Sequence, residues 1–156
     1  MKKGFFAAFL CALIMVLLPA AVYAKDGNFG DADGSSDNTY IIEDAEDLKA
    51  FRDRVNDGET GACAELTANI VLNCDENNQW TPIGYNKGTD DNIPYNGTFD
   101  GNGHTISGIY INTSEDYQGF FGYIDSNGTV KDLGIEDSWI KGYKYVGASL
   151  GVATEV

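Results

Sequence analysis

The sequence predicts an all-β protein, a right-handed parallel β-helix with an N-terminal capping helix, and three observations predict it. The segment 105–111 (TISGIYI) returns 24 residues later as 129–135 (TVKDLGI). Glycine and asparagine separate these short β-type segments, and one amphipathic helix pattern precedes them. A period in the low twenties is typical of a solenoid, in which successive coils stack.

The first 24 residues are predicted to be a signal peptide. Lys2 and Lys3 precede an apolar run from residue 5 to 18, and Val22-Tyr-Ala24 offers small residues at the two positions that a signal peptidase reads. The alternative is an uncleaved anchor, but the apolar run is short for a membrane span. We expect a secreted or cell-surface bacterial protein, extracellular or periplasmic, with no membrane insertion after cleavage.

The net charge of the mature chain restricts the classes of partner that it can bind. Loss of Lys2 and Lys3 leaves 8 of the 10 basic residues against 24 acidic residues, a net charge of −16. Nucleic acid and anionic membranes select basic surfaces and are therefore poor partners. We expect no cofactor, although an acidic surface permits weak binding of divalent cations.

Two cysteines, Cys63 and Cys74, remain after cleavage in a compartment that permits disulfides. One extended strand from 63 to 74 would separate their Cα atoms by ~36 Å, too far for a bridge. A tight turn at residues 68–69 would instead place them opposite each other. The sequence leaves the disulfide open.

The elements follow in order along the chain. Residues 25–38 form a polar leader loop, and residues 39–58 form a strand and the capping helix. Asp44 is the predicted N-cap, with Asp47 three residues later as in a capping box. The helix should end near Asn56-Asp-Gly58, where glycine accepts a left-handed conformation. Its apolar stripe is predicted to cover the first coil; it consists of Ala45, Leu48, Phe51 and Val55.

Residues 59–156 are assigned to the coils. Residues 80–84 form a corner, because Pro82 cannot sit in a central strand, and 85–94 form a polar excursion. The 24-residue shift stacks equivalent aliphatic residues into ladders: Ile106, Ile109, Ile111, Val130, Leu133 and Ile135. An antiparallel sandwich is the alternative, since Asx-Gly pairs are also hairpin signals.

Several motifs resemble those of bacterial GLUG-repeat surface proteins. They are Trp80-x-Pro-Ile-Gly84, residues 95–109 (YNGTFDGNGHTISGI), Gly119-Phe-Phe-Gly122, residues 128–135 (GTVKDLGI) and Tyr145-Val-Gly147. The resemblance covers residues 39–147 and implies a secreted or surface-displayed, adhesin-like β-helix without catalysis by the repeat. The sequence departs from the family pattern after Gly147, where the Gly-Leu-x-Gly motif of the family is no longer clear. We therefore expect an incomplete solenoid, a truncated fragment that self-associates through its open C-terminal coil.

Catalytic signals are few. His104 is the single histidine and is interpreted as a turn residue, because no partner histidine or zinc motif accompanies it. A carbohydrate-active β-helix, a polysaccharide lyase or hydrolase, is the alternative function, and it would gather acids on one face. The candidate acids are Asp100, Asp116, Asp125 and Asp132.

Aromatic residues give the better binding signal. Tyrosine and tryptophan on a sheet face can stack on sugar rings or contact protein, although most fill gaps between strands. The candidate ligand-stacking residues are Tyr110, Tyr117, Tyr123, Trp139 and Tyr143. We expect a non-catalytic module for adhesion or display, whose partner is a protein or glycan on a host or neighbouring cell. A gene remnant without function is the third hypothesis.

Overall fold

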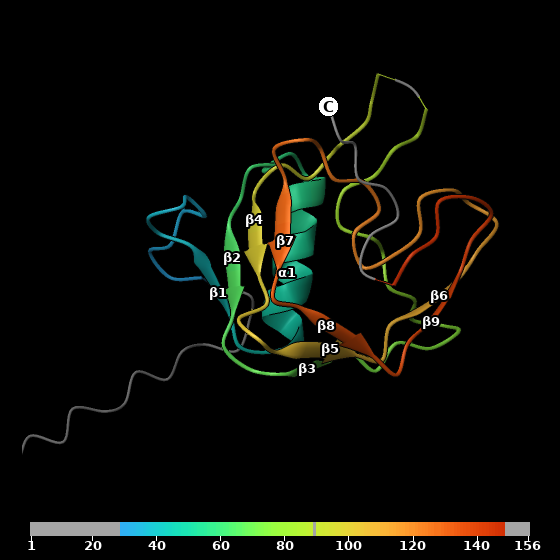
Figure 1. Cartoon of the computed structure of the whole chain (residues 1–156), viewed down its shortest axis with the longest axis horizontal. Helices are drawn as coiled ribbons and strands as arrows, with labels where there is room; N and C mark the ends of the chain where they lie inside the picture. The colour runs from blue at the N-terminus through green and yellow to red at the C-terminus, as the bar shows by residue number, and fades with distance from the viewer. Residues whose placement is uncertain (1–28, 89, 149–156) are drawn as a thin grey trace, which may run out of the picture.

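The computed structural model describes residues 29–88 and 90–148, so the predicted signal peptide lies outside it. These residues form one helix and nine short strands (Figure 1). The helix is α1 (Ala45–Asn56). The strands are β1 (Tyr40–Ile42), β2 (Ala64–Leu66), β3 (Ile70–Val71), β4 (Thr98–Asp100), β5 (Thr105–Ser107), β6 (Tyr110–Asn112), β7 (Thr129–Lys131), β8 (Gly134–Glu136) and β9 (Trp139–Lys141).

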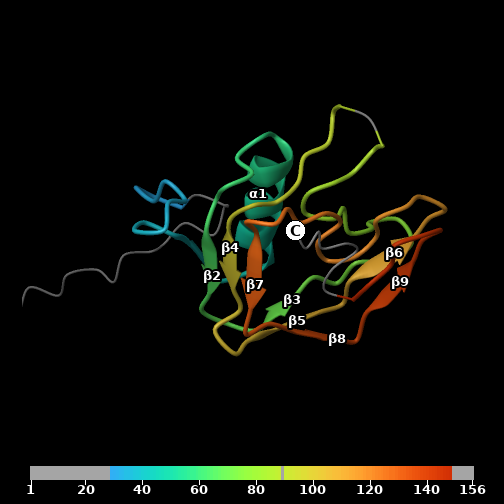
Figure 2. The ribbon, with the colours of Figure 1, turned by 45° about the horizontal axis from the view of Figure 1, so that its top comes forward.

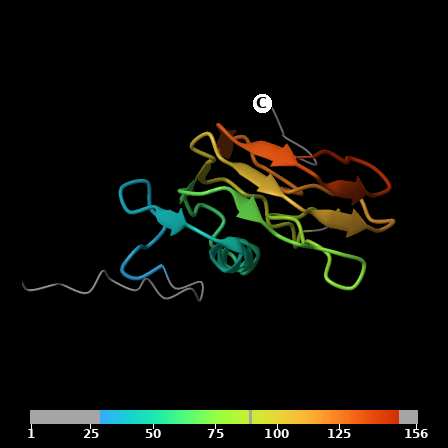
Figure 3. The ribbon, with the colours of Figure 1, turned by 90° about the horizontal axis from the view of Figure 1, so that it is seen from below.

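The strands pair in three small sheets, and every pairing within the sheets is parallel. The first sheet has the order β1-β2-β4-β7, the second β3-β5-β8, and the third contains β6 and β9. Figure 2 shows β2, β4 and β7 side by side, with β6 and β9 at the far end of the molecule. Seen from below, the green, yellow and orange segments lie above one another in chain order (Figure 3). The antiparallel sandwich is therefore not formed.

The register differs from the predicted period. Ile106 pairs with Ile135, 29 residues later, and Phe99 pairs with Val130, 31 residues later. Along the first sheet the shift changes from 24 residues between β1 and β2 to 35 between β2 and β4. The longer shift includes the polar excursion at 85–94. The alignment of Ile106 with Val130 is therefore wrong.

The prediction of an all-β, right-handed β-helix is also wrong. The structure has three separate parallel sheets of four, three and two strands with one helix, and the described residues form no closed solenoid. The strands have only two or three residues each and the shift between them varies. Each sheet therefore stays small and is joined to the next through an irregular corner.

Helix α1 begins and ends where its caps predict. The Asp44 carboxylate accepts hydrogen bonds from the backbone N–H groups of Glu46 (2.9 Å) and Asp47 (3.1 Å). The Asp47 side chain reaches back to the N–H of Glu43 at 3.1 Å. After the helix, Gly58 has a φ of 118° and ends it. The helix lies alongside the first sheet (Figure 1).

An aromatic cluster joins the helix to the sheets. Phe99 of β4 is fully buried. Its ring centroid lies 5.6 Å from that of Phe51 on α1, 5.6 Å from Phe120 and 5.5 Å from Phe121. Tyr95 is buried beside them and donates a hydrogen bond to the carbonyl of Ala62 at 2.9 Å. Because the Phe99 ring joins β4 to α1 and to the segment at residues 120–121, this cluster is the centre of the core.

Burial decreases toward the C-terminal strands. In the middle strands Phe99, Ile106 and Ile111 are buried, with at most 2% of their surface exposed. The apolar residues of the last strands and of the corner between β7 and β8 are only partly buried: Val130, Leu133, Ile135 and Ile140. The N-terminal part of the sheets therefore holds most of the apolar contacts.

The two cysteines are free thiols in the structure. Cys63 lies just before β2, and its thiol is 3.8 Å from the carbonyl oxygen of Gly61. Cys74 lies after β3, which belongs to a different sheet. The chain bends between β2 and β3 and does not fold back, so the disulfide that the sequence left open is not formed in the structure.

The ion pair of Asp100 and Lys131 gives the fold a small pH dependence. The Lys131 ammonium, on the neighbouring strand, lowers the pKa of the Asp100 carboxyl by donating a hydrogen bond to it. The stabilisation is present above the unfolded pKa of about 4 and is lost as the pH falls through the lower folded value. We expect Asp100→Asn to be less stable than wild type at pH 7. The difference should shrink toward pH 2 in urea titrations; an undiminished difference at pH 2 contradicts the ion pair.

Candidate functional site

The third sheet exposes aromatic side chains on its outer surface. Ile111 and Ile140 point into the core, so their neighbours on β6 and β9 point outward. Tyr110 and Trp139 are partners in the strand register. Trp139 is 61% exposed, which is unusual for so large an apolar ring. Two residues further along each strand, on the same outward side, Asn112 lies opposite Lys141.

Beyond the sheet, two corners of the chain stack on each other. The N–H of Thr113 donates to the carbonyl of Lys141 at 3.1 Å, and the N–H of Tyr143 donates to that of Glu115 at 2.8 Å. Gly142 is required here, because a Cβ at this position would lie 2.9 Å from the carbonyl oxygen of Glu115. An open pocket lies between the corners and is lined by Asn112, Thr113, Ser114, Lys141, Gly142 and Tyr143. We call it the corner pocket.

The corner pocket brings Tyr143 beside the sheet residues. Tyr143 is 69% exposed and the ammonium of Lys144 lies 5.0 Å from the centre of its ring. Because Asn112 and Lys141 line the same pocket, Tyr143 continues the outer surface of the third sheet. Tyr110, Trp139 and Tyr143 are together called the aromatic face.

A second aromatic group follows at the next corner. The rings of Tyr117 and Tyr145 stack with centroids 4.8 Å apart, and Tyr123 lies 6.3 Å from Tyr117. Tyr117 and Tyr145 both have left-handed backbone conformations, with φ of 60° and 56°. Gln118 pairs in parallel with Val146, so the Tyr-x-Gly motif and its later copy lie one above the other. The stacked rings are the structural result of this repeat.

The five predicted stacking residues therefore form two groups. Tyr110, Trp139 and Tyr143 belong to the aromatic face. Tyr117 and Tyr123 belong, with Tyr145, to the second group, which we call the tyrosine stack. Tyr145 and Lys141 also lie at these surfaces and were not among the predicted site residues. The repeated Tyr-x-Gly motif was the signal that could have identified Tyr145. Lys141 becomes recognisable only from the strand register, which places it beside Asn112.

Three of the candidate catalytic residues are engaged in local structure, whereas the buried Oδ1 of Asp116 has no hydrogen-bond partner among the described residues. The His104 ring nitrogen Nδ1 lies 3.2 Å from the amide oxygen of Asn69. Asp100 forms the ion pair with Lys131, and Asp125 accepts a hydrogen bond from the N–H of Ser126 at 2.6 Å. Over residues 29–88 and 90–148, no group of three or more histidine, cysteine or acidic side chains could hold a metal ion.

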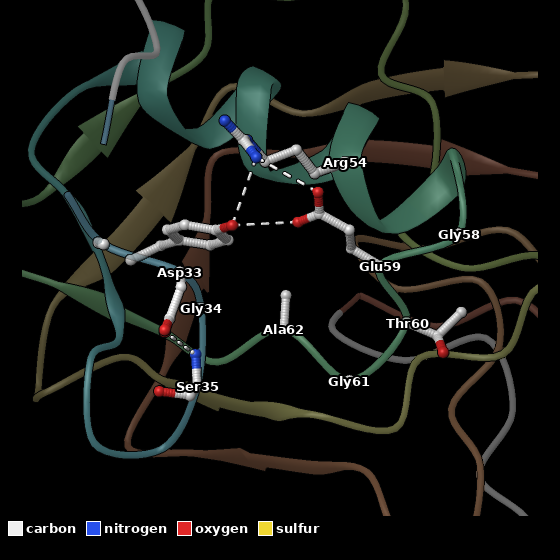
Figure 4. Close-up of a pocket in the computed structure, with 11 residues that line it drawn as sticks. Asp33, Gly34, Ser35, Arg54, Gly58, Glu59, Thr60, Gly61 and Ala62 are labelled. Carbon is white, nitrogen blue, oxygen red and sulfur yellow. Dashed lines mark hydrogen bonds and ion pairs between the residues drawn. The ribbon is translucent and has the colours of Figure 1, made fainter. Parts of the chain in front are cut away.

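A second pocket lies between the leader loop and the end of the helix (Figure 4). Arg54 donates to the Tyr40 hydroxyl at 3.3 Å and pairs with Glu59 at 3.3 Å, while the Tyr40 hydroxyl donates to Glu59 at 3.1 Å. Phe29 stacks on the Tyr40 ring at 4.4 Å. These polar groups hydrogen-bond to one another, so they hold the leader loop against α1.

Comparison with known proteins finds two relatives of much greater length. The chain is 32% identical over 145 residues to a protein of Evansella cellulosilytica named as a Gly-rich membrane protein; the match covers 87% of this chain and 16% of the relative. It is 32% identical over 130 residues to a protein of Haloquadratum walsbyi named halomucin, covering 77% of this chain and 1% of the relative. Neither name states a catalytic activity.

No protein-family model and no solved structure matches the chain. The resemblance to GLUG-repeat proteins therefore stays a prediction. Helix α1 is the one helix in the described part of the chain, and it lacks the length and apolar character needed to cross a membrane.

Proposed function

We propose that this chain is a non-catalytic module of a cell-surface or extracellular protein that binds a glycan through the aromatic face. The observation that carries the proposal is the exposure of Trp139 and Tyr143, at 61% and 69%. Large apolar rings exposed near one another on a folded protein are characteristic of interaction surfaces.

A glycan fits this surface better than an apolar protein partner. Sugar rings present C–H groups on their faces, which stack on aromatic rings, and hydroxyl groups at their edges. The aromatic face offers both kinds of contact, because the amide of Asn112 and the hydroxyl groups of Thr113 and Ser114 border Tyr143 in the corner pocket. A short aromatic surface with hydrogen-bonding groups at its rim is therefore suited to a sugar chain.

The two relatives support a location at the surface or membrane of the cell. One is named as a membrane protein, and this chain matches only a small part of it. The predicted signal peptide is consistent with export, and the net charge of −16 after its removal suits an extracellular surface. In this proposal the chain displays the aromatic face away from the cell and leaves any attachment to other parts of a larger protein.

The proposal predicts that Trp139→Ala weakens glycan binding about tenfold or more, since a stacking aromatic residue at a binding centre contributes more than about 1.4 kcal/mol. Residues 25–156 would be screened on a glycan array, and the bound glycan would then be titrated calorimetrically. Val71→Ala is the matched control, because Val71 is 55% exposed on β3 and lies outside the face.

Two results would contradict the proposal. One is the absence of binding to any glycan on the array, including when the array is probed with the tetramerised protein. The other is binding that Trp139→Ala and Val71→Ala affect equally. Binding only to a protein array would assign the face to a protein partner instead.

A further inference from the structure

Lys141 differs from every other basic residue that the structure describes. Four of them form ion pairs with carboxylates: Lys49, Arg52, Arg54 and Lys131. Lys87 and Lys144 lie over the rings of Tyr85 and Tyr143. Within residues 29–88 and 90–148, the Lys141 ammonium alone forms neither an ion pair nor a ring contact. In a chain with 24 acidic residues, a lysine without such a partner is unexpected.

The position of Lys141 places its ammonium group at the corner pocket. Lys141 points outward from β9 opposite Asn112 and lines the corner pocket together with Tyr143. The same pocket contains the hydroxyl groups of Thr113 and Ser114. The lining of the pocket therefore combines an aromatic ring, a cation and neutral hydrogen-bonding groups. This set of groups matches a sugar ring that carries a carboxylate.

The net charge restricts what kind of acidic glycan can bind. A polysaccharide with a charge on every sugar would bring many carboxylates close to a surface with a net charge of −16. A single carboxylate at Lys141 avoids most of this repulsion, because charges more than about 8 Å away are largely screened at physiological ionic strength. An isolated acidic sugar on an otherwise neutral chain is therefore favoured.

We propose that the corner pocket selects a neutral glycan that bears a single carboxylate sugar, with Lys141 contacting the carboxylate and Tyr143 stacking on the sugar ring. This proposal rests on the glycan-binding function above and adds the ligand class. Lys141 is the residue that determines the preference for the acidic sugar, whereas the aromatic face supplies contacts that neutral and acidic glycans share.

The test compares two probes that differ only by one carboxylate: xylotriose bearing one methylglucose, and xylotriose bearing one methylglucuronate. We expect wild type to bind the acidic probe about tenfold more tightly than the neutral one, as for one charge-assisted contact. In Lys141→Gln, the ratio of the two affinities should fall to about one. Lys87→Gln is the matched control, because it removes another exposed lysine next to a tyrosine, and should keep the wild-type ratio.

The outcomes separate this proposal from the proposed function. Equal binding of both probes by wild type would overturn the acidic-sugar proposal and leave glycan binding in place. A preference for the acidic probe that persists in Lys141→Gln would overturn the role of Lys141. Failure of both probes on a protein that binds other, uncharged glycans on the array would overturn this proposal alone, whereas failure of every glycan would overturn both.

Discussion

Phe99→Ala is expected to destabilise the protein by about 3–5 kcal/mol, the cost of removing a buried aromatic ring. The ring contacts Phe51 on the helix and both Phe120 and Phe121 in the following turn, and it is fully buried. The cavity cannot close easily, because its walls belong to α1, to β4 and to the segment after β6. This loss is a large part of the free energy of unfolding of a typical domain, which is about 5–15 kcal/mol.

The measurement is urea unfolding of residues 25–156, followed by circular dichroism and by tryptophan fluorescence. Val71→Ala is the control, since this exposed side chain should contribute less than about 1 kcal/mol. A loss of less than about 1 kcal/mol for Phe99→Ala would contradict the aromatic cluster as the centre of the core. If Phe99→Ala does not fold, Phe99→Leu provides a milder variant whose loss should still exceed that of Val71→Ala.

Gly97→Ala should also be strongly destabilising, by about 3 kcal/mol. A Cβ at position 97 would lie 2.8 Å from the carbonyl carbon of Ala62, a backbone atom of the preceding turn. Backbone cannot rotate away as a flexible side chain can, so the two turns must separate. That separation would weaken the hydrogen bond from the N–H of Asn96 to the carbonyl of Thr60, which is 2.8 Å long.

Gly61→Ala is the matched control for this substitution. Gly61 lies in the turn that faces Gly97, but a Cβ there would meet only the side-chain oxygen of Asn96, at 3.3 Å. A side-chain oxygen can move, so the expected loss is below about 1 kcal/mol. Thermal unfolding of both variants compares them directly. Equal stability of the two variants would mean that these turns are not in the close register of the structure.

Local signals in the sequence predicted the helix well. The N-cap Asp44, the acid at position 47 and the glycine at 58 set its limits, and each acts on hydrogen bonds within a few residues. The short strands were also recognisable around residues 64–72 and 105–111. These features depend on neighbours in the chain, so one sequence contains the information that is needed to find them.

The register could not be predicted in the same way. Segments 105–111 and 129–135 look alike because each contains a strand, a bend and a second strand. In the structure the first is β5 followed by β6, with Gly108 in a left-handed conformation at the bend, and the second is β7 followed by β8, with Asp132 in that conformation. The two segments are therefore alike because each forms a corner between two strands, and not because they pair with each other in the sheets. Contacts with other turns, which the local pattern does not contain, decide the pairing.

In the candidate site, too, some residues could be predicted from the sequence and others could not. Exposed aromatic residues such as Trp139 could be selected from the sequence, because strand alternation beside Ile140 predicts an outward side chain. Nothing in the local pattern indicates that Lys141 lies without a carboxylate partner among residues 29–88 and 90–148. That property depends on where the acidic residues of all neighbouring turns are placed, and only the folded chain shows it.

The two tryptophans allow the central claim to be tested in one experiment. Trp80 is buried, 3% exposed, and its indole N–H donates to the carbonyl of Phe120 at 3.1 Å. Trp139 is 61% exposed on the aromatic face. Each indole N–H gives its own peak in a ¹H–¹⁵N correlation spectrum, and Trp139→Phe assigns the two peaks.

The decisive measurement is a titration of ¹⁵N-labelled residues 25–156 with a glycan identified on the array. If the aromatic face is the binding site, the Trp139 indole peak shifts in a saturable manner and the Trp80 peak stays in place. Saturable glycan binding that leaves the Trp139 peak unmoved would contradict the account.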